Sequence, residues 1–102
     1  MKQDEWLAEE QTLLDLRAAL DRSFTAFSEQ FDAGNKDGQR AVREVGKQAL
    51  SDYQAGLARL AARGKSDWDV RRRLLGLAWR KWRAKENRFA RELAGAAFGR
   101  IG

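Results

Sequence analysis

The chain has 102 residues, a formal net charge of +5 and no Pro, Cys or His. This length allows one domain with a single hydrophobic core, and the missing Cys and His exclude thiolate chemistry, a typical zinc site and the commonest general base. We therefore expect a protein that is not an enzyme and that uses no metal, no cofactor and no small-molecule substrate.

The composition predicts an all-α protein. Ala, Leu, Arg, Glu, Lys and Gln dominate the sequence, and all of them favour helices. Glycines within 34–38 and at Gly64 mark two breaks, which leaves helices near 4–33, 39–63 and 67–97. Because short connections make successive helices antiparallel neighbours, we expect residues 1–102 to form one helical domain, an up-down-up antiparallel three-helix bundle with long helices.

The first two predicted helices each carry an apolar stripe at helical spacing. In the first helix the stripe consists of bulky residues, namely Trp6, Leu13, Leu16, Leu20, Phe24, Phe27 and Phe31. In the second helix the stripe has small residues at its centre, where Gly46, Ala49 and Gly56 lie side by side. We expect large side chains to pack against this small stripe.

The third predicted helix, over 67–97, carries two sets of apolar residues. The longer set predicts the core face and consists of Trp68, Leu75, Ala78, Trp79, Trp82, Phe89, Leu93, Ala96 and Ala97. The shorter set lies on the far side of the same helix and consists of Val70, Leu74 and Leu77. Surplus apolar residues outside a core face predict a second interface, so we expect self-association, as a homodimer or another oligomer, or a partner helix there.

Charge is strongly polarised along the chain. Residues 63–102 hold twelve Lys or Arg and four Asp or Glu, whereas residues 1–62 hold eight and eleven. The outward arc of the third predicted helix carries Arg73, Arg80, Lys81, Arg88 and Arg91, with Arg83 at its flank. This arc is about 27 Å long at the helical rise, a length that matches several phosphates of a DNA or RNA backbone. We do not expect bases to stack on Trp79 and Trp82, because both lie on the predicted core face.

No apolar segment approaches the roughly 20 residues of a membrane-spanning helix, and the acidic start of the chain is unlike a signal peptide. We therefore expect a cytoplasmic protein that does not bind membranes. The function predicted from these patterns is that of a small basic accessory protein without enzymatic activity. It would dock on nucleic-acid backbone, or on a nucleoprotein complex, through the Lys and Arg residues of the third helix.

A second interpretation uses the same basic face as a protein-docking surface. In that case the chain is a small inhibitor or assembly adaptor that binds an acidic protein or itself, with Val70, Leu74 and Leu77 as the apolar part of the interface. The Arg- and Ala-rich, Pro-free composition is similar to that of small helical accessory proteins of phages and plasmids.

Overall fold

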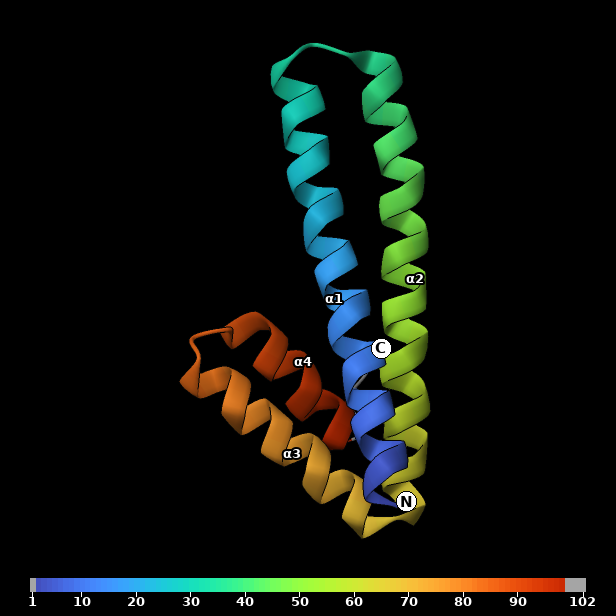
Figure 1. The fold of residues 1–102 in the computed structure, drawn as a ribbon, viewed down its shortest axis with the longest axis vertical. Helices are drawn as coiled ribbons and strands as arrows, with labels where there is room; N and C mark the ends of the chain where they lie inside the picture. The colour runs from blue at the N-terminus through green and yellow to red at the C-terminus, as the bar shows by residue number, and fades with distance from the viewer. Residues whose placement is uncertain (1, 99–102) are drawn as a thin grey trace. The chain divides into compact units, whose positions relative to one another are not determined.

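The computed structural model describes residues 2–98, which form four α-helices and no strand (Figure 1). The helices are α1 (Gln3–Asp32), α2 (Lys36–Ser66), α3 (Trp68–Arg83) and α4 (Asn87–Ala97). The prediction of an all-α protein is confirmed. The prediction of a three-helix bundle is wrong, because the helix expected over 67–97 is divided into α3 and α4.

The described chain divides into two compact units. Residues 2–7 and 56–98 form the first unit, and residues 8–55 form the second. Residues 1 and 99–102 of the domain expected from the sequence lie outside the described residues. Each unit is described on its own below.

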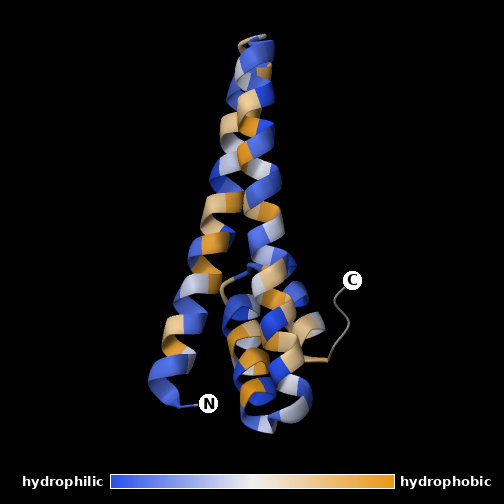
Figure 2. Ribbon diagram, turned by 90° about the vertical axis from the view of Figure 1, so that its right-hand side faces the viewer, coloured by the Kyte–Doolittle hydropathy of each residue, from blue (hydrophilic) through white to orange (hydrophobic). Residues whose placement is uncertain are grey.

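The second unit is an antiparallel pair made of α1 from residue 8 onward and α2 up to residue 55 (Figure 1). Hydrophobic and hydrophilic segments alternate along both helices (Figure 2). The buried apolar side chains of this unit are Leu13, Leu20, Ala49 and Tyr53. Its exposed large apolar side chains are Phe24, Phe31, Val45 and Leu50. The stripes predicted for these two helices are therefore buried over only part of their length.

Gly34 ends α1 as the sequence predicts. Its φ of 69° is left-handed, and its amide donates to the carbonyl of Phe31 at 3.0 Å while the amide of Asn35 donates to that of Gln30 at 3.0 Å. This pair of bonds is the Schellman motif, in which glycine suits the left-handed position. The Asn35 side chain then caps α2, because its Oδ1 accepts from the amide of Gly38 at 3.0 Å.

The first unit contains α3 and α4, which lie side by side as an antiparallel hairpin (Figure 1). Asp67 caps α3, since its Oδ1 accepts hydrogen bonds from the amides of Asp69 at 3.0 Å and Val70 at 3.4 Å. The core of the unit is apolar and small-residue-rich, and it includes Trp6, Leu57, Leu60, Ala61, Val70, Leu74, Leu77, Ala78, Phe89, Ala90, Leu93, Ala96 and Ala97.

The break between α3 and α4 is a second Schellman motif, with Lys85 in the position that glycine usually occupies. Lys85 has a φ of 66°. Its amide donates to the carbonyl of Trp82 at 3.0 Å, and the amide of Glu86 donates to that of Lys81 at 2.9 Å. The sequence from 83 to 87 contains no Gly or Pro and reads as helix, which is why the three-helix prediction missed this turn.

The turn at Lys85 also reverses the predicted orientation of α3. Val70, Leu74 and Leu77, expected on the outer side, are 1%, 0% and 1% exposed. Trp79 and Trp82, expected in the core, are 58% and 55% exposed. Both predictions are wrong for one physical reason. In an uninterrupted helix the apolar residues from 89 to 97 share the tryptophan face, whereas the turn brings them back against α3 as a separate helix.

We predict that Lys85→Gly raises the free energy of unfolding by about 1 kcal/mol, because glycine adopts a left-handed φ without the clash that a Cβ causes. Lys85→Ala is the matched control, since it removes the same charge but keeps the Cβ. Urea unfolding of both variants measures the difference. Equal stability of the two variants would show that residue 85 is not held in a left-handed conformation.

We predict that Leu74→Ala lowers the free energy of unfolding by about 2–5 kcal/mol, as expected for a fully buried leucine. Trp79→Ala removes a larger side chain from the opposite face and should cost less than about 1 kcal/mol, because that side chain is mostly in water. Urea unfolding compares the two variants. A larger loss for Trp79→Ala than for Leu74→Ala would restore the orientation of α3 predicted from the sequence.

Candidate nucleic-acid interface

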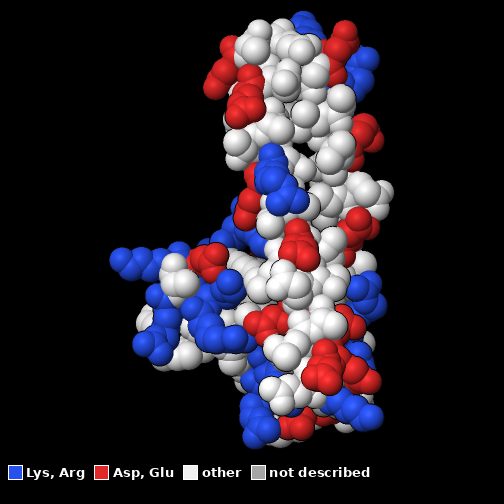
Figure 3. All heavy atoms as spheres, viewed as in Figure 1, with Lys and Arg blue, Asp and Glu red and all other residues white. Residues whose placement is uncertain are grey.

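The α3–α4 hairpin, residues 68–97, is the most basic part of the described chain. It carries nine Lys or Arg and three Asp or Glu, which gives a net charge of +6. Each of its three acidic side chains forms an ion pair with a Lys or Arg, in the pairs Asp69–Arg72 at 2.6 Å, Glu86–Lys81 at 3.3 Å and Glu92–Arg88 at 3.6 Å. Figure 3 shows Lys and Arg atoms gathered over this hairpin. The acids of the hairpin therefore leave most of its positive charge uncompensated.

The structure places the six predicted binding residues on two helices instead of one. Arg73, Arg80, Lys81 and Arg83 belong to α3, and Arg88 and Arg91 belong to α4. Because α4 runs back along α3, the single straight line of cations expected over 73–91 does not exist. The cations are instead distributed over a compact hairpin surface.

These six side chains differ in how available they are to a ligand. Arg80, Arg83, Arg88 and Arg91 are exposed, and Arg73 is half-buried. The Lys81 side chain is 24% exposed and its Nζ lies 3.3 Å from the carboxylate of Glu86, so it bridges the turn between the helices. Four basic side chains of the hairpin have no carboxylate at ion-pair distance within residues 2–98, namely those of Arg73, Arg83, Lys85 and Arg91. These four are the side chains best suited to bind phosphate.

An aromatic surface lies on the side of α3 opposite its buried face. Trp68, Trp79 and Trp82 are 65%, 58% and 55% exposed. The rings of Trp79 and Trp82 stack on each other, with centroids 5.0 Å apart and planes inclined by 23°. Trp68 lies beneath the guanidinium of Arg71, whose Cζ is 5.6 Å from the ring centroid.

A shallow groove of about 350 Å³ borders the two stacked tryptophans. Apolar side chains from both helices form most of its lining, and Arg91 contributes a cation, so the lining residues are Leu75, Ala78, Trp79, Trp82, Ala90, Arg91 and Ala94. This groove combines flat aromatic surface, apolar surface and positive charge within one unit. Such a site can bind a planar anionic ligand by stacking and charge.

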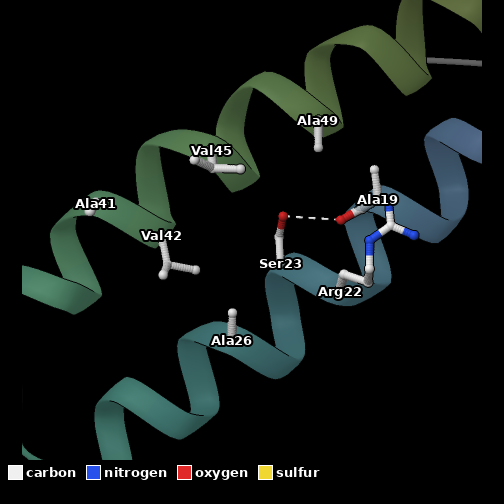
Figure 4. A pocket seen from close by; sticks show the side chains of 8 residues that line it. All are labelled: Ala19, Arg22, Ser23, Ala26, Ala41, Val42, Val45 and Ala49. Carbon is white, nitrogen blue, oxygen red and sulfur yellow. Dashed lines mark hydrogen bonds between the residues drawn. The ribbon is translucent and has the colours of Figure 1, made fainter.

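The second unit has a groove of a different character, about 380 Å³ in volume (Figure 4). It is lined by Ala19, Arg22, Ser23, Ala26, Ala41, Val42, Val45 and Ala49, which come from α1 and α2. The Ser23 hydroxyl donates to the carbonyl of Ala19 at 3.1 Å. The lining is therefore nearly all apolar, which suits another apolar surface better than a polar ligand.

Residues 2–98 contain no group of three or more acidic side chains placed to hold a metal ion. Over the same residues, none of the helices combines the length and hydrophobicity that crossing a bilayer requires. The exposed side chains of the hairpin offer charge pairing and aromatic stacking.

Sequence reasoning missed the exposed tryptophans because it counted residues from both helices toward one stripe. A usable signal was present, since Val70, Leu74, Leu77 and Ala78 follow the i, i+4, i+7, i+8 spacing of a buried face. Of the ten other residues from 71 to 83, six are Arg or Lys, so Val70, Leu74, Leu77 and Ala78 form an aliphatic face bordered by charged residues. The structure buries all four of its members.

Comparison with known proteins gives no relative from which to assign a function: no family model, no curated protein and no solved structure matches this chain.

Proposed function

We propose that this chain is a cytoplasmic accessory protein without enzymatic activity that binds the phosphate backbone of nucleic acid through the α3–α4 hairpin. The observation that carries the proposal is the uncompensated charge of the hairpin, +6 over residues 68–97. Cations placed on a small surface bind phosphates and release the counterions condensed on the nucleic acid. Contacts of this kind provide affinity with little dependence on base sequence.

Arg83 and Arg91 are the side chains on which this proposal depends most. Both are exposed, each lies on a different helix of the hairpin, and neither has a carboxylate at ion-pair distance within residues 2–98. Phosphate binding at these positions breaks no existing ion pair. Arg72 and Arg88, in contrast, exchange an acidic partner for a phosphate when they bind.

We predict that the double variant Arg83→Glu/Arg91→Glu weakens binding to a generic nucleic acid by about tenfold or more near 50 mM salt. It should also reduce the slope of log K against log salt by about two, because two phosphate contacts are lost. Fluorescence anisotropy over a salt series measures both quantities, and circular dichroism confirms that the variant is folded.

The matched control is Lys36→Glu/Arg40→Glu, which changes net charge equally at two exposed positions of the second unit. This control should retain most of the wild-type affinity. If both double variants lose affinity equally, binding depends on net charge alone and the hairpin is not the interface. If the wild-type protein binds no nucleic acid even at low salt, the proposed function is wrong.

A second candidate function is association with another copy of the chain through the second unit. The anchors first expected for a protein interface, Val70, Leu74 and Leu77, are buried in the first unit and cannot serve. The groove between α1 and α2 favours self-association instead, because it is nearly all apolar and its Val45 is 63% exposed. Two such helix pairs can complete each other as a four-helix bundle.

For this second candidate we predict that the wild-type protein sediments as a dimer and that Val45→Glu reduces its mass by half, since a carboxylate in the groove opposes apolar contact. Ser51→Glu adds the same charge at an exposed position outside the groove lining and should remain dimeric. Analytical ultracentrifugation of the three proteins makes the comparison. A wild-type protein that is monomeric at every concentration would rule this candidate out.

A further inference from the structure

The stacked rings of Trp79 and Trp82 on α3 remain in contact with water, so the hydrophobic free energy of burying them is not gained. Trp79 and Trp82 are more than half exposed although the chain buries smaller side chains, including three alanines of α4. Their stacking at 5.0 Å covers one face of each ring in part and leaves other ring surface accessible. Adjacent exposed aromatic rings of this kind usually mark a binding surface.

Two arginines lie near this aromatic pair, one on each helix of the hairpin. Arg83 follows Trp79 by four residues, which places it one helical turn farther along the same side of α3. Arg91 of α4 lines the same groove as both rings. A ligand seated on the tryptophans therefore meets a guanidinium in the groove and another one turn along α3.

We infer that the α3–α4 hairpin binds single-stranded nucleic acid, with bases stacked on Trp79 and Trp82 and phosphates held by Arg83 and Arg91. This inference rests on the proposed function and specifies its ligand. Duplex DNA and RNA keep their base faces stacked inside the helix, so only an unpaired strand offers those faces to an indole. The strand also supplies the negative charge that complements a hairpin with a net charge of +6.

The groove beside the tryptophans supports the same ligand. It is a shallow, open groove of about 350 Å³, and its lining is apolar apart from Arg91. A base inserted there lies between aromatic and aliphatic surface while its phosphate remains near the arginine. Stacking of this type tolerates every base, so we expect little sequence preference.

The test compares three probes of the same length, about 20 nucleotides: an oligothymidine strand, an abasic strand with the same phosphates, and the duplex form of the thymidine strand. Wild-type protein should bind oligothymidine about tenfold or more tightly than the abasic strand, since stacking adds to phosphate binding only when bases are present. It should also prefer oligothymidine to the duplex.

Two double variants assign the stacking to named side chains. Trp79→Ala/Trp82→Ala should lose the preference for oligothymidine over the abasic strand while binding the abasic strand as the wild type does. Trp79→Phe/Trp82→Phe should retain most of that preference, because phenylalanine also stacks. Phe24→Ala/Phe31→Ala is the matched control, since it removes two rings that are 58% and 64% exposed in the second unit.

The outcomes separate this inference from the function on which it rests. Equal binding of the three probes, unchanged in Trp79→Ala/Trp82→Ala, would overturn base stacking and leave phosphate docking in place. Failure to bind any probe near 50 mM salt would overturn both. Binding to vesicles of anionic lipid, with no binding to oligothymidine, would identify the tryptophans as a membrane-contact surface and would likewise overturn the inference.

Discussion

The left-handed turn at Lys85 sets how α3 and α4 pack in the first unit. It ends α3 after Arg83 and allows α4 to return along α3, so that Leu93 is fully buried in the same unit as Leu74. Without that turn, residues 68–97 would continue as one helix about 45 Å long, and the apolar side chains of its second half would lie on the tryptophan side. One backbone conformation therefore decides which face of α3 is buried and which is presented to solvent.

Burying the aliphatic face has two consequences for function. It leaves Trp68, Trp79 and Trp82 exposed, and it brings cations from α3 and α4 onto one small hairpin. Neither consequence stabilises the folded chain, because indole rings that remain in water provide little hydrophobic stabilisation and because like charges repel. A ligand that is both aromatic and anionic relieves both costs when it binds. Unpaired nucleic acid has that combination of properties, which connects the geometry of the hairpin to the proposed function.

How far the sequence predicts this structure depends on how each turn is encoded. The end of α1 is predictable because Gly34 occupies the left-handed position, whereas the end of α3 is hidden because Lys85 has the same role without a glycine. The all-α class and the basic character of the C-terminal segment follow from composition alone. The exposure of Trp79 cannot be predicted in this way, since two apolar stripes compete on α3 and the path of the chain after residue 83 determines which one packs.

The solvent accessibility of Trp79 tests the orientation of α3 most directly. A variant with Trp6, Trp68 and Trp82 replaced by Phe reports on Trp79 alone, and the variant that retains only Trp6 provides a buried reference, since Trp6 is 4% exposed. Acrylamide quenching of the two variants would be compared. We predict long-wavelength emission and several-fold stronger quenching for Trp79 than for Trp6, in keeping with its exposure of 58%. Short-wavelength emission and equal protection of the two residues would contradict both the orientation of α3 and the aromatic surface built on it.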